Sequence, residues 1–216
     1  MCGIVGYTGK QSVAKQILDA LELLEYRGYD SAGMAIVDET NGQVQIRKRA
    51  GRVADLEKVW KANPVNGICG IGHTRWATHG GVSDVNAHPH RAGRVTLVHN
   101  GIIENYEELK DHFGLADELI SDTDSEVVAA VLNRFYTGDP HEALFQTVKC
   151  LKGTFALVVI FDDIPDVIFA IRNVSPIVAA YREDGTMLAS DVAALGGQAT
   201  SYMVVPEYHV VELHTD

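Results

Sequence analysis

The chain has 216 residues, of which 46% are hydrophobic, and its formal net charge is −11 at pH 7. This length suits one large domain or two small ones, and the acidic balance argues against nucleic acid and anionic membrane surfaces as partners. Three scattered cysteines, Cys2, Cys69 and Cys150, give no disulfide framework and favour a reducing compartment. With no signal peptide and no apolar run of membrane length, we expect a soluble cytoplasmic protein.

The first half of the chain shows strand and helix signals in alternation. An Asn-Gly pair at residues 41–42 predicts a hairpin, and apolar residues at helical spacing predict the helices. In chain order we expect strand Gly3–Gly9, helix Val13–Tyr26, strands Ser31–Asp38 and Gln43–Lys48, helix Val53–Trp60, strand Ile68–Arg75 and strand Val95–His99.

The segment from Trp76 to Gly93 is polar and rich in Gly, His, Asn and Pro. It is too long for a simple connection, so we expect a binding loop or a lid. The next strand, Val95–His99, should be closed by a turn at Asn100-Gly101.

The second half begins with helices and continues with strands. Thr123 and Glu126 have the spacing of a capping box, which places Asp124 in the first turn of a helix. We see no linker, and the pattern fits one layered domain with sheets face to face and helices outside. The expected elements are helices Glu104–Phe113, Asp124–Tyr136 and Pro140–Leu151, strands Thr154–Phe161, Val167–Ile171, Ile177–Tyr181 and Thr186–Ala189, a short helix Asp191–Leu195, and strands Met203–Val205 and His209–Leu213.

Cys2 is the first candidate for chemistry. If Met1 is removed, Cys2 carries both a thiol and a free α-amine, whose pKa of about 7.7–8.0 suits a general base. A thiol nucleophile beside such a base is a complete catalytic device. The alternative is that Cys2 is a small apolar residue that opens a buried strand.

Arg75, beside Thr74, stands at a predicted strand end and offers a planar fork for a carboxylate; the alternative is a surface arginine on a strand edge. Five histidines lie nearby, but their spacing matches no standard zinc pattern and thiolate ligands are sparse, so we predict no metal site. The histidines are His73, His79, His88, His90 and His99.

Asn100 and Gly101 together offer a side-chain amide and an unobstructed backbone N–H. Two such donors can hold the oxyanion of a tetrahedral intermediate, although Asn-Gly is also a common turn pair. Asp124 can pair with a substrate ammonium, or it can simply complement the helix dipole.

Six segments, taken together, resemble one family. The chain is similar to the glutaminase domains of the glucosamine-6-phosphate synthase family, which are type 2 glutamine amidotransferases of the N-terminal-nucleophile class. The resemblance runs over essentially the whole chain. The segments are CGIVG from Cys2, EYRGYDSAG from Glu25, HTRWATHG from His73, NAHPH from Asn86, HNGIIENY from His99 and SDTDSEV from Ser121.

The resemblance implies an α+β fold, a four-layer αββα sandwich, over residues 2–216, and hydrolysis of L-glutamine to L-glutamate and ammonia without metal or organic cofactor. It implies that Cys2 is the nucleophile and that Asn100 and the Gly101 N–H form the oxyanion hole. It also implies that the α-amine of Cys2 acts as the base, which requires removal of Met1, and that the sugar-isomerising domains, the ammonia-consuming partner, lie outside this chain.

The resemblance further assigns residues to the substrate's amino-acid head. Arg75 and Thr78 match groups that hold the α-carboxylate, and Asp124, assisted by the Gly101 carbonyl, matches the group that takes the α-ammonium. Trp76 and His79 belong to a loop that folds over the substrate, and Arg27 matches an arginine near the nucleophile. No role follows for His88 and His90. The alternatives are a non-catalytic glutamine- or glutamate-binding regulatory module, or the glutaminase domain of another amidotransferase.

Overall fold

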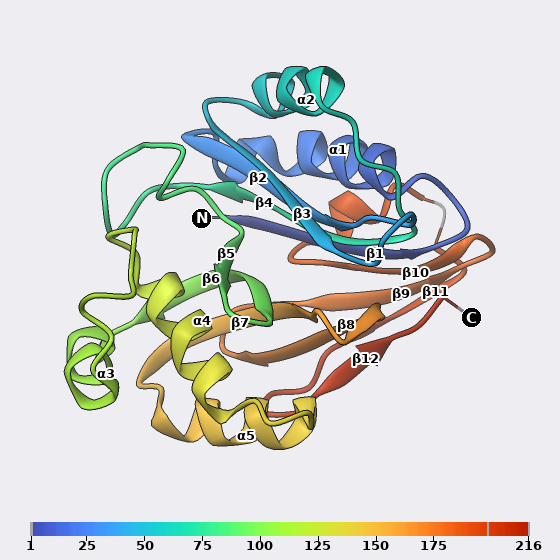
Figure 1. The fold of residues 1–216 in the computed structure, drawn as a ribbon. Coiled ribbons are helices and arrows are strands. Elements are labelled where there is room, and N and C mark those ends of the chain that lie inside the picture. The colour runs from blue at the N-terminus through green and yellow to red at the C-terminus, as the bar shows by residue number, and fades with distance from the viewer. Residues whose placement is uncertain (1, 198, 216) are drawn as a thin grey trace.

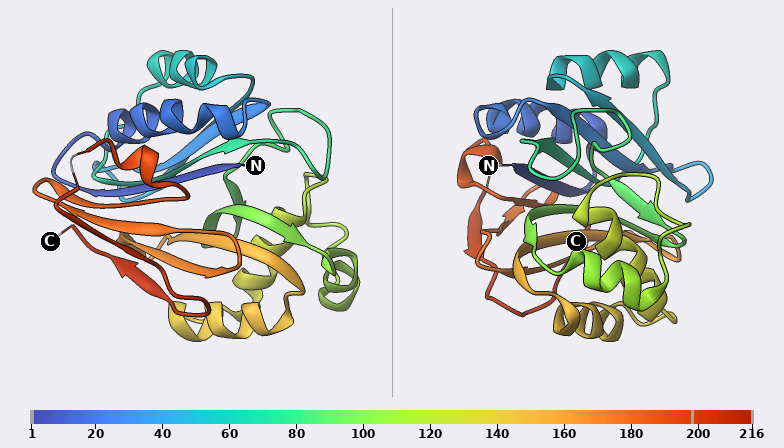
Figure 2. Two further views of the ribbon diagram at one scale, coloured as in Figure 1. Left: turned by 180° about the vertical axis from the view of Figure 1, so that it is seen from behind. Right: turned by 90° about the vertical axis from the view of Figure 1, so that its left-hand side faces the viewer.

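The computed structural model describes residues 2–197 and 199–215. Two antiparallel sheets lie face to face, and helices cover the outer face of each (Figure 1). Seen from behind and from the side, the same four layers follow one another as helix, sheet, sheet and helix (Figure 2). The expected αββα sandwich is therefore confirmed.

The first sheet contains the strand that begins next to Cys2. Its order is β11-β9-β10-β1-β4-β2-β3, so β1 lies in the middle, between β10 and β4. Central strands are buried on both faces, and β1 is buried along its whole length. The strands are β1 Gly3–Gly9, β2 Ser31–Val37, β3 Val44–Ala50, β4 Cys69–Arg75, β9 Val178–Arg182, β10 Gly185–Ala189 and β11 Ser201–Val204.

The second sheet carries the strand that contains Asn100. Its order is β12-β8-β7-β6-β5, and its long central strands form the other wall of the sandwich. The strands are β5 His90–Ala92, β6 Val95–Ile103, β7 Gly153–Phe161, β8 Ile164–Asn173 and β12 Val211–Leu213.

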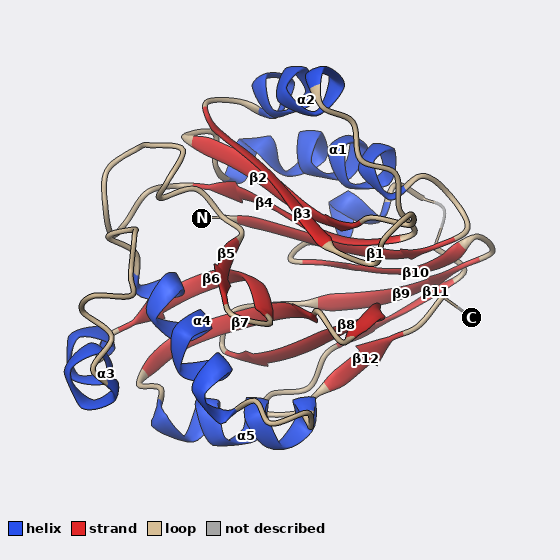
Figure 3. Cartoon of the chain, viewed as in Figure 1, coloured by secondary structure: helices blue, strands red, loops and turns tan. Residues whose placement is uncertain are grey.

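The helices pack on the outer faces of the sheets (Figure 3). α1 Val13–Leu24 and α2 Val53–Ala62 cover the first sheet, and α4 Asp124–Phe135 and α5 Pro140–Cys150 cover the second, with α3 Tyr106–Phe113 beside α4. Two short 3₁₀ turns, Glu25–Arg27 and Val192–Leu195, complete the elements.

Three apolar layers hold the sandwich together. One lies between the first sheet and α1, another lies between the second sheet and α4 and α5, and the third lies between the sheets. The middle layer is built from small and branched side chains such as Ile4, Ile71, Val98 and Val158. Burial of these side chains, at about 25 cal/mol per Å² of apolar area, is the main term that keeps the two sheets in contact.

The turn predicted at Asn100-Gly101 is wrong. Both residues lie inside β6, where they pair with Ala156 and Phe155 of β7. The short strand β5 was also missed, because a three-residue strand inside the polar segment has no periodic signal. By contrast, α4 begins at Asp124 as predicted, and the Thr123 hydroxyl accepts the Glu126 N–H. The Glu126 carboxylate accepts the N–H groups of Ile120 and Ser121 instead of that of Thr123, so only half of the predicted capping box forms.

Among the described residues, no helix combines the length and the apolar character that crossing a membrane requires.

The loop that carries His88 packs directly on β2. A β-carbon at Gly33 would overlap the carbonyl oxygen of His88 and would lie 2.7 Å from the β-carbon of Lys48. The Lys48 ammonium fixes the same loop by donating to the carbonyls of Val85, Ala87 and Pro89. Close backbone approach therefore sets the position of this loop.

We predict that Gly33→Ala lowers the free energy of unfolding by about 2 kcal/mol or more, because the added carbon forces the loop away from β2. Gly81→Ala, where nothing lies within 4 Å of the added carbon, should change stability by less than about 0.5 kcal/mol. Chemical denaturation of both variants measures the difference. Equal stabilities would show that this contact does not constrain the loop.

Candidate active site

Cys2 directly precedes β1, and the pairing of β1 with β4 sets its surroundings. Gly3 pairs with Thr74, so Cys2 lies beside the end of β4. The Trp76 N–H donates to the Cys2 sulfur at 3.2 Å, and the sulfur lies 3.5 Å from the Trp76 carbonyl oxygen. Burial raises the pKa of the Cys2 thiol above its ordinary value, and the Trp76 N–H opposes that rise. Met1 lies outside the described residues, so the free amine of Cys2, which requires removal of Met1, stays a prediction.

Asn100 reaches Cys2 from the opposite sheet. Its Nδ2 donates to the Cys2 carbonyl oxygen at 3.1 Å, and Arg27 Nε donates to the same oxygen at 3.3 Å. Arg27 is held in turn by Asp191, whose carboxylate lies 2.6 Å from Nη1. The backbone of the nucleophile candidate is thus held by donors from two different elements.

Gly101 follows Asn100 in β6 with φ +131°, a conformation that strongly favours glycine. A β-carbon there would also overlap the Thr154 carbonyl oxygen of the neighbouring strand. The absence of a side chain leaves the backbone of Gly101 at the wall of the cavity next to Cys2.

A cavity of about 320 Å³ opens between the sheets at Cys2. That volume lies at the lower end of the range for small-molecule sites. The cavity is lined by Cys2, Arg27, Trp76, Thr78, Asn100, Gly101, Ile102, Thr154, Ser175 and Pro176.

A smaller chamber of about 20 Å³ shares Cys2, Trp76, Thr78 and Gly101 with the large cavity. Its wall also contains Arg75, His79 and Asp124. All nine predicted site residues therefore lie around these two adjoining spaces, although Arg75, His79 and Asp124 contact only the smaller one.

Arg75 is 3% exposed, and its guanidinium donates to the carbonyl oxygens of His79, Gly80 and Gly81. The predicted fork for a carboxylate is therefore engaged by its own loop in this structure. A carboxylate that binds Arg75 has to share or displace these carbonyls.

Asp124 is 5% exposed and accepts the Ile103 N–H at 2.9 Å and the Ser125 hydroxyl at 3.3 Å. An ionised carboxylate has about four acceptor sites, so Asp124 retains capacity for a further donor. Its position at the start of α4 is also favourable for a negative charge.

The segment after β4 is anchored at several points. Asp30 accepts the Ala77 N–H, the Trp76 ring lies edge-on to Tyr29 at 5.7 Å, and the His79 ring lies edge-on to Tyr106. Trp76 is nevertheless 45% exposed. Trp76 and Thr78 of the predicted binding loop line the cavity next to Cys2.

The histidines without a predicted role form a buried group behind the site. The ring of His88 stacks on that of His73 at 4.0 Å and lies edge-on to that of His90, and His90 Nε2 is 3.1 Å from the Thr123 hydroxyl. Burial lowers the pKa values of all three rings. In the described part of the chain, no cluster of three or more His, Cys, Asp or Glu side chains is arranged to hold a metal ion.

Four residues of the cavity wall have no signal in the sequence. Ile102 and Thr154 meet only because β6 pairs with β7, and Ser175 and Pro176 belong to the connection between β8 and β9. His73 was grouped with the possible zinc ligands, and its contact with Asn100 Oδ1 at 3.0 Å was not anticipated.

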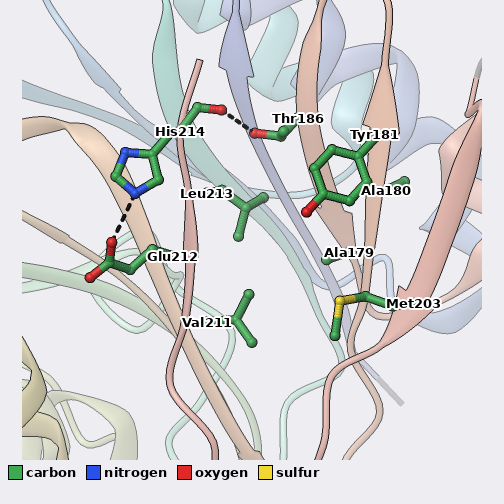
Figure 4. A pocket seen from close by; sticks show the side chains of 9 residues that line it. All are labelled: Ala179, Ala180, Tyr181, Thr186, Met203, Val211, Glu212, Leu213 and His214. Atoms are coloured by element: carbon green, nitrogen blue, oxygen red, sulfur yellow. Dashed lines mark hydrogen bonds and ion pairs between the residues drawn. The ribbon is translucent and has the colours of Figure 1, made fainter. Parts of the chain in front are cut away.

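A second cavity, of about 110 Å³, lies beside β9, β11 and β12 (Figure 4). Tyr181, Met203, Val211 and Leu213 surround it, and the His214 ring contacts the Glu212 carboxylate at its edge. The start of β1 and the end of β12 lie at opposite ends of the sandwich (Figures 1 and 2). This cavity is therefore separate from the Cys2 site.

Comparison with known proteins decides the family. Residues 38–214 match the glutamine amidotransferase domain family. The chain belongs to this family.

Curated relatives of the amidotransferase domain are named glutamine–fructose-6-phosphate aminotransferase (isomerizing). The protein from Bacillus subtilis is 44% identical and that from Streptomyces coelicolor is 46% identical, each over 100% of this chain and 36% of the relative. The protein from Thermus thermophilus is 46% identical over 90% of this chain and 32% of its own length. The chain thus spans about a third of the length of these relatives.

Two solved structures share the fold. A glutamine phosphoribosylpyrophosphate amidotransferase from B. subtilis, complexed with ADP and GMP, has a TM-score of 0.78 at 20% identity. A structure described as the allosteric regulatory enzyme of purine biosynthesis has a TM-score of 0.80 at 21% identity. Each likeness covers 100% of this chain and 49% of the other, and it establishes the fold alone.

We predict that Cys2 reacts slowly at neutral pH in protein shown by intact mass to retain Met1. Because burial raises the pKa of the thiol, its thiolate fraction should rise with pH around a midpoint above the value of about 8.5 for a free cysteine. Alkylation by iodoacetamide, followed at each cysteine by peptide mass spectrometry, measures this midpoint, with the partly exposed Cys150 as internal reference. A midpoint below 8 would show that the thiol is activated before Met1 is lost.

Proposed function

We propose that this chain hydrolyses L-glutamine to L-glutamate and ammonia through a γ-glutamyl thioester on Cys2. The observation that carries the proposal is the position of the Cys2 thiol and the Asn100 amide on the wall of one cavity, in a chain of the glutamine amidotransferase family. A thiol nucleophile with a donor opposite it is the arrangement that acyl transfer requires.

The first half of the reaction forms the thioester. After Met1 is removed, the neutral α-amine of Cys2 takes the thiol proton, directly or through a water, and sulfur attacks the side-chain amide carbon of glutamine. A C–S bond forms and the carbonyl oxygen becomes an oxyanion. When the C–N bond breaks, the amine returns the proton to the leaving nitrogen, which departs as ammonia. Water then cleaves the C–S bond, which releases glutamate and restores the thiol.

The oxyanion is assigned to Asn100 Nδ2 and the Gly101 N–H. Preorganised donors of this kind are worth about 2.7–4 kcal/mol of barrier each. Asn100 is held between the two sheets, and Gly101 stands in a backbone conformation that requires glycine. Neither donor has to reorganise while charge develops on the substrate oxygen.

The small chamber is assigned to the charged head of glutamine. Arg75 and Thr78 take the α-carboxylate, and Asp124 with the Gly101 carbonyl takes the α-ammonium. Arg75 and Asp124 both line the chamber, and their opposite charges would fix the orientation of a free amino acid. Binding energy at the head group then places the side-chain amide over the thiol, which lowers the entropic part of the barrier.

Trp76 and His79 are assigned to the loop that folds over the bound amino acid. Arg27 is assigned to hold the backbone of Cys2 in place. Exclusion of bulk water around the site strengthens the electrostatic interactions within it. The contacts of Arg75 with the loop carbonyls support a coupling between substrate binding and loop position.

We further propose that residues 2–216 form the ammonia-supplying domain of a longer enzyme. The curated relatives are about three times as long as this chain and are named for transfer of an amino group from glutamine to fructose 6-phosphate. We assign the ammonia to the conversion of fructose 6-phosphate to glucosamine 6-phosphate. This conversion would take place on a sugar-isomerising domain outside this chain.

We predict that the chain without Met1 releases ammonia from glutamine and that Cys2→Ala lowers this release by at least about 10³-fold, because neither Cys69 nor Cys150 lines the two spaces of the site. Intact mass establishes removal of Met1, and a coupled glutamate dehydrogenase assay measures ammonia. Cys150→Ala, which alters a partly exposed cysteine in α5, is the matched control. Full activity of Cys2→Ala would refute the mechanism, and glutamine binding without ammonia release would favour a regulatory module.

We predict that Asp124→Asn raises the KM for glutamine by about 100-fold, because the α-ammonium loses a buried charged partner. Asp117→Asn, at an exposed position before α4, should leave KM unchanged. Steady-state kinetics of the two variants at equal ionic strength make the comparison. An unchanged KM for Asp124→Asn would remove Asp124 from the binding site.

A further inference from the structure

His73 lies behind the oxyanion donor rather than in the cavity. It belongs to β4 of the first sheet, is 1% exposed, and has its Nε2 3.0 Å from both the His99 carbonyl oxygen and Asn100 Oδ1. These contacts connect the first sheet to β6 of the second sheet.

The partners of His73 determine where its proton lies. The carbonyl oxygen of His99 can only accept a hydrogen bond, so Nε2 must carry the proton that is shared there. Nδ1 has no hydrogen-bond partner among the described residues. Burial lowers the pKa of His73 to about 3, so near neutral pH the ring is neutral and carries this single proton.

The protonated Nε2 in turn determines how the Asn100 amide is turned. Since Nε2–H donates, the Asn100 atom that faces it is the acceptor Oδ1, and Nδ2 then faces the Cys2 carbonyl at 3.1 Å. A flipped amide would place two donors against each other at His73 and two acceptors at Cys2. Both ends of the amide therefore favour the same orientation.

We propose that His73 is a positioning residue, which holds the Asn100 amide in the orientation that presents Nδ2 to the oxyanion. The inference rests on the proposed glutamine hydrolysis. Nδ2 carries two hydrogens. One is donated to the Cys2 carbonyl, and the other serves the oxyanion in the adjoining cavity. Without the Nε2–H donor, only the Cys2 carbonyl opposes rotation of the amide about its last bond.

The position of His73 is itself supported by packing. Its ring stacks on that of His88 with 22° between the planes, and His88 lies edge-on to His90. The ring plane of His73 is therefore fixed by His88 and His90, whose side chains form no hydrogen bond with Asn100. A packing role and a hydrogen-bonding role of His73 can be separated by experiment.

The test compares His73→Leu, which removes the donor, with His73→Gln, whose amide nitrogen can replace Nε2–H. We expect His73→Leu to lower kcat for glutamine by about 10- to 100-fold, below the 10²- to 10³-fold loss of a whole oxyanion donor, with KM within about threefold. His73→Gln should retain kcat within about fivefold. Thr96→Val, which alters a buried hydroxyl of β6 that has no hydrogen-bond partner in the described part of the chain, should behave as wild type.

A double-mutant cycle identifies the route of the effect. If His73 acts through Asn100, His73→Leu should lower kcat no further than about twofold in an Asn100→Ala background. Equal losses in both backgrounds would overturn the inference, and so would full kcat of His73→Leu. These results are separate from the proposed function, which is refuted if the wild-type chain without Met1 releases no ammonia or if Cys2→Ala keeps full activity.

If His73→Leu does not fold, ¹⁵N shifts of the His73 ring in the wild-type protein give the answer. Protonated Nε2 with unprotonated Nδ1 is the expected result. A proton on Nδ1 would leave Nε2 as an acceptor and would overturn the inference.

Discussion

The hydrogen bond from Asn100 Nδ2 to the Cys2 carbonyl oxygen joins the nucleophile candidate directly to the opposite sheet. Cys2 precedes β1, the central strand of the first sheet, and Asn100 lies in β6, which pairs with the central strand β7 of the second sheet. A thiol and an amide donor can share a reacting atom only if the two sheets keep a constant separation here. Burial of the apolar layer between the sheets maintains that separation.

The same constraint explains the backbone features around the site. Gly101 adopts a conformation that favours glycine and lies too close to Thr154 for a side chain, so the chain reaches the cavity wall as bare backbone. His73 on β4 contacts Asn100 from behind. The charged head-group candidates, Arg75 and Asp124, come from the end of β4 and the start of α4. Elements of both sheets and one outer helix thus converge on a single space.

Much of the fold was predictable from the sequence, because local signals were strong, whereas the roles of the site residues followed from the family resemblance and not from local patterns. The helical spacing of apolar residues predicted α1, and the cap at Thr123 predicted that α4 begins at Asp124. Asn100-Gly101 was misassigned to a turn. A glycine that a turn requires and a glycine that the close approach of a neighbouring strand requires cannot be told apart in a single sequence. The orientation set by His73 had no signal at all, since it depends on the contact between two sheets.

The most direct measurement is rapid acid quenching of the protein during glutamine turnover, followed by mass spectrometry of the peptide that carries the amino-terminal cysteine. A nucleophilic Cys2 predicts a glutamyl adduct on that peptide, and hydroxylamine should remove it because it is a thioester. Turnover of glutamine without this adduct, or with the adduct on Cys69 or Cys150, would contradict the central claim that Cys2 forms the covalent intermediate.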